Sequence, residues 1–408
     1  MKRCDLEMNN PLPTGVPAEL GFCPDRIGHL LQVFQAEVDR KRLPGAVVLI
    51  ARRGQVLLHE CVGQQDPQAA TPMALDSIFR IYSMTKPVVS VATMMLMERG
   101  RLLLNDPVAK YLPEFADVQV LAHLSGHPVK HRPKAVPTVQ DLLRHTAGLT
   151  YEILGSEPIQ RQYAQARLAS RERSNREFAR ALAALPLAFE PGTVWEYSRA
   201  TDLLGALVEV VAGQSLGAFL HDSVFAPLGM VDTAFHVPPE KHHRIAEPFV
   251  KDPDGGIAMQ LFDMRQPVAM QAGGAGLAST ADDYARFLQC LLNRGELNGV
   301  RLLAPNTVRL MTVDHLGSIG VNRGGRSGEL LQPGHGFGLG FAVRLEDGVA
   351  ANPGSKGMYF WGGIAGTTFF VDPAQDFFAL MLTQAPNQRD HYRPLFRNLV
   401  YAALTDGN

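Results

Sequence analysis

Cysteine is scarce in this chain, with four residues in 408. Cys4, Cys23, Cys61 and Cys290 are far apart and form no C-x-x-C pair. Disulfide frameworks are typical of short secreted chains, so this pattern predicts free thiols in a cytoplasmic protein. The first ten residues also predict a cytoplasmic protein, because their two basic residues are not followed by the apolar core of a secretory signal.

Long apolar runs and long runs of one charge are also missing. The apolar stretch at 88–97 is far too short to span a membrane and carries polar residues. The formal net charge is −1, and no basic run is long enough to attract a polyanion. We therefore expect neither a membrane nor a nucleic acid as a partner.

Two common kinds of catalytic site lack their sequence signatures. The chain has no G-x-S-x-G, so the nucleophile elbow of α/β-hydrolases is excluded. His123, His127 and His131 are four residues apart, but Gly126 and Pro128 argue against a helix that presents them together. We expect no metal and no cofactor.

Apolar residues are plentiful, at 46% of the chain, and 408 residues exceed what one compact core usually absorbs. Early in the chain the pattern predicts a helix over 25–43 and a hairpin of strands 46–51 and 55–61. Later strands are expected at 338–345, 367–371 and 377–382, followed by a helix over 392–404. In the middle, the clearest expected helices are 139–145, 176–185, 201–212, 216–225 and 281–292.

Strands and helices at both ends therefore flank a helical middle. We predict an α+β fold in which residues 1–112 and 313–408 form one mixed domain, interrupted by a mostly helical domain at 113–312. The glycine-rich segment 317–336 is expected to be a long loop.

The most informative motif is Ser83-Met84-Thr85-Lys86, which joins a polar loop to an apolar run with helical spacing. Lys86 is expected one turn from Ser83 on the same face of that helix. A serine hydroxyl needs a base to become a nucleophile, and a buried lysine can serve. The alternative is that Ser83 simply caps the helix.

Two further segments carry groups that such chemistry needs. Tyr197 follows the Pro191-Gly192 turn at the start of a predicted helix, where its hydroxyl can carry a proton between nucleophile and leaving group. Near the C-terminus, Trp361-Gly362-Gly363-Ile364 precedes a strand, so the N–H groups of Ile364 and Ser83 can form an oxyanion hole. A core tyrosine and a tight glycine turn are the structural alternatives.

Together these segments resemble the serine hydrolases that include class C β-lactamases, D-alanyl-D-alanine carboxypeptidases, family VIII esterases and related acyltransferases. The resemblance extends from about residue 46 to 382 and rests on the ordered motifs at 83–86, 142–149, 191–198 and 273–280. It implies a β-lactamase/transpeptidase-like fold, an α/β sandwich with an antiparallel sheet, with the active site between that domain and the helical one.

Departures from the β-lactamase motifs narrow the expected substrate. Arg199 stands where those enzymes carry Asn, and Trp361-Gly362-Gly363 stands where they carry Lys-Thr-Gly. Without that Lys, a β-lactam carboxylate loses a charge-assisted hydrogen bond. The pattern is more similar to family VIII esterases and to acyltransferases that acylate polyketide alcohols.

The resemblance thus implies a cytoplasmic serine esterase that cleaves small uncharged esters through an acyl-Ser83 intermediate. Lys86 and Tyr197 would move the proton, and Tyr82, Trp361, Gly362, Gly363 and Arg199 would contact the substrate. Three alternatives remain open: an acyltransferase that uses the same intermediate, a β-lactamase or D-amino-acid peptidase, and a non-catalytic binding protein of the same fold. The oligomeric state stays open as well.

Overall fold

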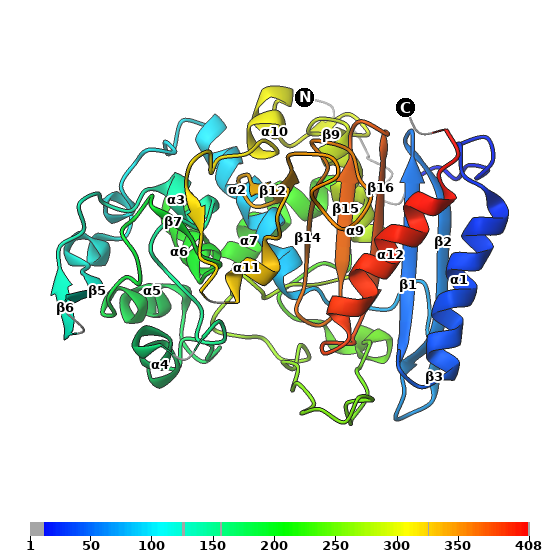
Figure 1. Ribbon diagram of the computed structural model, residues 1–408, viewed down its shortest axis with the longest axis horizontal. Helices are drawn as coiled ribbons and strands as arrows, with labels where there is room; N and C mark the ends of the chain where they lie inside the picture. Colours follow the sequence, from blue (N-terminus) through cyan, green and yellow to red (C-terminus); the bar gives the residue numbers. More distant parts are fainter. Residues whose placement is uncertain (1–11, 125–126, 156, 325, 407–408) are drawn as a thin grey trace.

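The computed structural model describes residues 12–124, 127–155, 157–324 and 326–406. Its main feature is a single eight-stranded sheet in the order β12-β13-β14-β15-β16-β1-β2-β3, in which every neighbouring pair is antiparallel (Figure 1). The strands are β1 (Gly45–Arg52), β2 (Gln55–Asp66), β3 (Thr71–Pro72), β12 (His335–Phe337), β13 (Ala342–Arg344), β14 (Tyr359–Gly362), β15 (Thr368–Asp372) and β16 (Phe377–Thr383). Strands from the two ends of the sequence meet where β1 pairs with β16.

Both faces of this sheet are covered, which explains why its central strands are continuously apolar. Along β1, Val47 and Leu49 point into one core, and the alternate residues Val48 and Ile50 point into another. Helices α1 (Pro24–Asp39) and α12 (Arg389–Ala403) cover one face, and α2 (Thr85–Glu98) and α9 (Ala281–Leu292) belong to the other side. The predicted α+β sandwich with an antiparallel sheet is confirmed.

The other half of the molecule is built mainly from helices around α6 (Figure 1), and most residues of α6 are buried. Its helices are α3 (Val139–Leu143), α4 (Pro158–Gln165), α5 (Asn175–Ala183), α6 (Ala200–Ala212), α7 (Leu216–Leu220) and α8 (Ala226–Leu228), with a π-helical turn at His221–Phe225 between the last two. Beside the large sheet lie α10 (Pro305–Met311) and α11 (Ser327–Leu330).

Most of the elements predicted from the sequence form within a few residues of their expected bounds, and α9 has the bounds predicted for it. The helix expected at 216–225 is wrong in part, because α7 ends at Leu220 and continues as the π-helical turn. The expected loop at 317–336 contains β11 (Gly320–Val321), α11 and part of β12. A small hairpin, β5 (Val120–Leu124) with β6 (His127–His131), formed where few strands were expected.

The two-domain division stays a prediction. Residues 113–312 include α9, which nevertheless packs against β16 and β1 of the large sheet. Within the described residues no single helix is long and apolar enough to cross a membrane, although α6 and the helical stretch after it, bent by 79°, pass that test as a pair. Cys23, Cys61 and Cys290 are free thiols, and Cys4 lies outside the described residues.

Candidate active site

The predicted nucleophile lies in a tight turn immediately before α2. Ser83 is the middle residue of the 3-10 turn at Tyr82–Met84, and α2 begins at Thr85. Ser83 forms no capping hydrogen bond to the helix, so the interpretation as a simple N-cap fails. Tyr82 has a φ of 43°, a left-handed conformation that is unfavourable for a bulky residue and common beside functional groups. Its hydroxyl accepts a hydrogen bond from the backbone N–H of Phe262. This bond links the turn that contains Ser83 to the loop that contains Phe262.

Lys86 lies one turn beyond Ser83 and is almost completely buried, with 1% of its surface exposed. Its Nζ is 3.2 Å from Ser83 Oγ, and it also donates to the Tyr151 hydroxyl at 3.1 Å and to the Gly274 carbonyl at 2.6 Å. No described carboxylate forms an ion pair with it. The amine is therefore held by neutral oxygen atoms and aimed at the serine.

Tyr197 approaches Ser83 from the helical half, just before α6. Its hydroxyl donates to Ser83 Oγ at 2.6 Å, and the Trp361 indole Nε1 donates to the Tyr197 hydroxyl at 3.3 Å. His145 packs against the Tyr197 ring, with ring centroids 5.0 Å apart, and is itself fixed by a 3.0 Å contact between Nδ1 and Ser198 Oγ. Burial, with help from the nearby Lys86, lowers the pKa of His145, so its ring is neutral at physiological pH.

The segment after Trp361 packs against the serine turn. Trp361 and Gly362 end β14, and the chain then turns through Gly363 and Ile364. A Cβ on Gly363 would lie 2.4 Å from both the Ile81 carbonyl oxygen and Thr367 Oγ1, so this glycine permits a close approach to the backbone beside the nucleophile. Gly362 and Ile364 line the cavity and Gly363 does not, and the contact of Gly363 with substrate stays a prediction.

The two N–H groups expected to form the oxyanion hole have no hydrogen-bond acceptor in the described part of the chain. Ser83 and Ile364 both line the same cavity, and β14 packs against the turn that holds Ser83. Free backbone donors that face a cavity beside a nucleophile are the arrangement that stabilises a developing oxyanion.

Tyr151 is the site residue that sequence reasoning missed. It follows the 142–149 motif, but no spacing or residue pattern distinguished it from a core tyrosine. In the structure its hydroxyl contacts Lys86, and its ring lies 5.3 Å from the Tyr197 ring. Burial, reinforced by the Asp202 carboxylate, raises the pKa of Tyr151, which keeps its hydroxyl protonated.

Arg199 lies at the cavity wall, and two carboxylates neutralise its charge. It forms ion pairs with Glu152 and, at 3.3 Å, with Asp202, and its guanidinium lies over the Tyr151 ring. Burial opposes its charge, but the Asp202 and Glu152 carboxylates more than offset this and raise its pKa. Asp202 in turn accepts a hydrogen bond from the N–H of Gly274, whose carbonyl binds Lys86. Arg199 thus supports the wall behind Lys86, and its contact with substrate stays a prediction.

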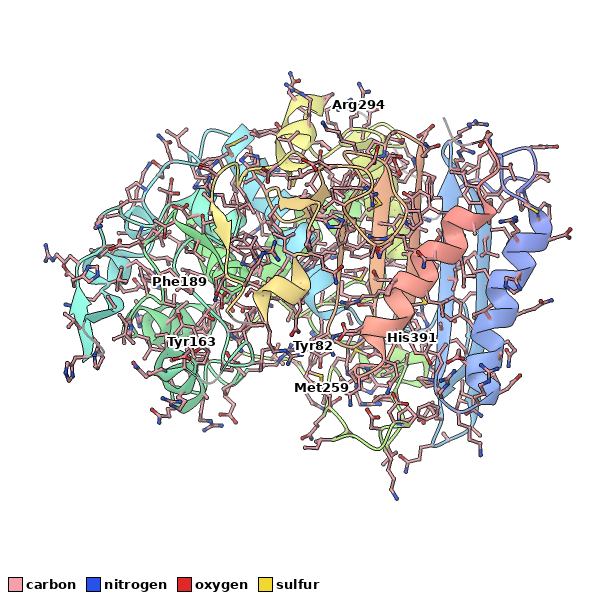
Figure 2. All side chains as sticks on the ribbon, viewed as in Figure 1. Tyr82, Tyr163, Phe189, Met259, Arg294 and His391 are labelled. Carbon is pink, nitrogen blue, oxygen red and sulfur yellow. The ribbon has the colours of Figure 1, made fainter. Side chains whose placement is uncertain are left out.

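These groups surround one cavity with a volume of about 1000 Å³. Figure 2 labels Tyr82 and Met259, two of its lining residues, between the helical half and α12. The structure therefore brings to one cavity most of the predicted site residues: Tyr82, Ser83, Tyr197, Arg199, Trp361, Gly362 and Ile364. Lys86 lies beneath the surface of the cavity. Among the described residues, no group of three His, Cys, Asp or Glu side chains is placed to hold a metal ion.

Comparison with known proteins fixes the family. The profile of the family described as Beta-lactamase matches residues 30–402. This chain belongs to the Beta-lactamase family. The resemblance expected from the motifs is confirmed, together with the fold class.

Proteins whose names describe esterase or acyltransferase activity are also similar to this chain. It is 34% identical to the esterase EstB of Burkholderia gladioli, over 86% of this chain and 88% of EstB. It is 29% identical to the monacolin J acid methylbutanoyltransferase of Aspergillus terreus, over 92% and 95% of the two chains. The solved structure of EstCE1, described as a hydrolase with promiscuous acyltransferase activity, matches with a TM-score of 0.78 and 30% identity, over 92% of this chain and 98% of that one. These similarities support an esterase or an acyltransferase.

Proposed function

We propose that this protein is a serine carboxylesterase that works through an acyl-Ser83 intermediate. The observation that carries the proposal is that Lys86 Nζ and the Tyr197 hydroxyl both contact Ser83 Oγ, at 3.2 and 2.6 Å, at the wall of a large cavity. A serine with two proton carriers within reach, beside two free backbone N–H groups, has the parts that acyl transfer requires.

The first half of the reaction forms the acyl-enzyme. Ser83 Oγ attacks the ester carbonyl, and its proton passes to the Lys86–Tyr197 pair. The carbonyl oxygen becomes an oxyanion, which the N–H groups of Ser83 and Ile364 stabilise. The bond to the leaving oxygen then breaks, and Tyr197 donates the proton to the departing alcohol. In the second half, water attacks the acyl carbonyl and gives its proton to the Lys86–Tyr197 pair. The bond to Ser83 Oγ then breaks, the pair returns the proton to Ser83, and the acid is released.

The cavity favours an uncharged acyl group close to Ser83. Tyr197 and Trp361 have ring centroids 5.2 Å apart, and Phe337 packs edge-on against Trp361 at 5.4 Å. An apolar acyl chain gains contact area against these rings, and Trp361 stands where a β-lactamase carries the Lys that binds a carboxylate. This is why a β-lactamase or D-amino-acid peptidase is the weaker proposal.

Acyl transfer is the second candidate, because an alcohol can replace water in the deacylation step without any other change in the site. The description of EstCE1 and the name of the Aspergillus acyltransferase support it for this family. We propose a small-molecule ester as the substrate and the cytoplasm as the location, the latter from the free cysteines.

Turnover of p-nitrophenyl butyrate, with and without a primary alcohol, tests this function. The esterase predicts release of p-nitrophenol and butyric acid at a rate that Ser83→Ala abolishes. Formation of the butyryl ester of the alcohol in large excess over butyric acid would instead support the acyltransferase. No release above that of Ser83→Ala, for a panel of acyl chain lengths, would leave the binding protein as the better account.

A further inference from the structure

Glu196, the residue before Tyr197, is a buried carboxylate that the proposed mechanism does not use. It follows β7 (Val194–Trp195), a short strand that pairs in parallel with β11. Only 1% of its surface is exposed, and it forms no ion pair in the described part of the chain. A buried carboxylate without a cation is costly unless hydrogen bonds replace the water that it has lost. Its hydrogen-bond donors therefore indicate what it does.

Three neutral side chains donate to this carboxylate. Thr150 Oγ1 donates to Glu196 Oε1 at 2.8 Å, and Asn322 Nδ2 donates to Glu196 Oε2 at 2.9 Å. The Ser327 hydroxyl is the third donor. Burial raises the pKa of Glu196, and these three hydrogen bonds oppose that rise because they favour the charged form. The carboxylate thus joins residues that are far apart in the sequence.

The third donor connects Glu196 to the proposed proton carrier. Ser327 Oγ accepts the backbone N–H of Tyr197 at 3.2 Å, so one hydroxyl bridges the Glu196 carboxylate and the Tyr197 backbone. Thr150 directly precedes Tyr151, and the Tyr151 and Tyr197 rings lie 5.3 Å apart. Glu196 therefore attaches the segment that carries Tyr197 to the loop that carries Tyr151.

Backbone hydrogen bonds fix the segment from which the carboxylate projects. The N–H of Glu196 donates to the His145 carbonyl at 3.0 Å. The N–H of Asn322 donates to the Trp195 carbonyl, also at 3.0 Å. The segment before Tyr197 is thus bonded on two sides, and the Glu196 side chain supplies a further attachment.

The donors around Glu196 require a carboxylate at this position, because they cannot turn around to accept. Asn322 Oδ1 accepts the N–H of Gly324 at 3.1 Å, which directs its NH2 group toward Glu196. Thr150 Oγ1 accepts from Gln160 Nε2 at 3.4 Å, which leaves its hydroxyl hydrogen for Glu196. An ionised carboxylate only accepts, whereas an amide of similar size carries one NH2 group. In Glu196→Gln one donor would therefore face another donor.

We propose that Glu196 is a positioning residue, which holds the Tyr197 hydroxyl against Ser83 Oγ. This role rests on the proposed acyl-Ser83 function, and it adds a residue that touches neither the substrate nor the reacting atoms. Glu196 does not line the cavity, so its loss should lower kcat and leave KM nearly unchanged.

Steady-state kinetics of Glu196→Gln with p-nitrophenyl butyrate test this role. We expect kcat to fall by about 10- to 150-fold, the range for loss of a hydrogen bond to a charged group, while KM changes less than about twofold. Glu209→Gln is the matched control, since Glu209 on α6 also accepts from two neutral donors, Asn175 Nδ2 and the Leu216 N–H, each at 3.0 Å. Its kcat should stay near that of the wild type, and equal kcat values for the two variants overturn the role.

A double variant separates positioning from a general loss of structure. Tyr197→Phe removes the hydroxyl that Glu196 is proposed to hold, so adding Glu196→Gln should slow acylation of Ser83 by no more than about twofold. A merely structural carboxylate would instead lower the rate by the same factor with and without the Tyr197 hydroxyl. That additive result overturns the role.

Ser327→Ala tests the same connection if Glu196→Gln does not fold. This variant keeps the carboxylate and removes only the hydroxyl that bridges it to the Tyr197 N–H. We expect a smaller loss in kcat, about 2- to 10-fold, as for a hydrogen bond between neutral groups, again with KM nearly unchanged. A wild-type kcat in Ser327→Ala overturns the role.

The position of Tyr197 can also be measured without turnover. In a crystal structure of Glu196→Gln, the Tyr197 hydroxyl should lie beyond hydrogen-bond reach of Ser83 Oγ, compared with 2.6 Å here, while Glu209→Gln should keep the contact. A displaced Tyr197 supports the role even if the wild type hydrolyses no ester, in which case only the proposed function fails. An unmoved Tyr197 overturns the role, and Ser83-dependent turnover by the wild type would still support the function.

Discussion

The two walls of the cavity differ in how their polar groups are satisfied. The groups that contact or support Ser83 have protein partners: Lys86 has three, Tyr197 contacts both Ser83 and Trp361, and Arg199 is held by two carboxylates. On α12, which lines another wall of the cavity, Arg393 and Arg397 keep donors without a partner. A wall whose groups already bind one another is suited to fixed chemistry, and a wall with unsatisfied donors is suited to selecting a ligand.

The largest effect is expected when the proposed nucleophile, Ser83, is removed. Ser83→Ala should lower turnover of p-nitrophenyl butyrate by on the order of 10⁴ or more, as loss of a serine nucleophile does in other enzymes. Steady-state rates and a thermal unfolding curve on the same preparation provide the check. A variant that keeps even a tenth of the wild-type rate would exclude Ser83 as nucleophile.

The proton carriers should show the next largest effects. Lys86→Ala and Tyr197→Phe should each reduce kcat by several orders of magnitude, because each removes a group that contacts Ser83 Oγ. The double variant should be little worse than either single one, since the groups act as a unit. Near-normal turnover by Tyr197→Phe would mean that this tyrosine is structural.

A smaller effect is expected at Tyr151, which touches Lys86 and not Ser83. Tyr151→Phe leaves a buried N–H of Lys86 without its 3.1 Å partner, at a cost of about 1–3 kcal/mol, or roughly 5- to 150-fold in kcat/KM. Tyr359→Phe is the control, because the Tyr359 hydroxyl is buried without a partner. Equal activity of the two variants would show that Tyr151 does not position Lys86.

The smallest predicted effect concerns the close packing behind the serine turn. Gly363→Ala would force a Cβ against the Ile81 carbonyl, and overpacking of this kind typically costs about 1–3 kcal/mol of stability. Gly28→Ala in α1, where nothing lies within 4 Å of a new Cβ, should be neutral or slightly stabilising. Melting temperatures of the two variants compare them directly, and an unchanged value for Gly363→Ala would argue against a required glycine.

The groups around Ser83 were largely predictable from the sequence. Local spacing places Ser83 and Lys86 on one helical turn, and the motif resemblance indicates Tyr197 and Trp361. Tyr151 was not predictable, since its role depends on a loop meeting α2 in three dimensions. The arginines of α12 were missed for the same reason. The expected helix began at 392 and excluded Arg389, and no sequence pattern shows that Arg397 lacks a partner.

The charge of the substrate depends on more than the β14 motif. The absence of Lys on the β14 edge predicts an uncharged ester, and this stays a prediction. The arginines of α12 line the same cavity, and Arg393 and Arg397 pack against Gly362 and Phe360 of β14.

The most direct test of the central claim is mass spectrometry of the acid-quenched enzyme during turnover of p-nitrophenyl butyrate, followed by peptide mapping. The account predicts a single butyryl group on the peptide that contains Ser83, absent from Ser83→Ala and retained for longer in Tyr197→Phe than in the wild type. A butyryl group on any other residue, in an enzyme whose Ser83→Ala variant still turns over the ester, would contradict it.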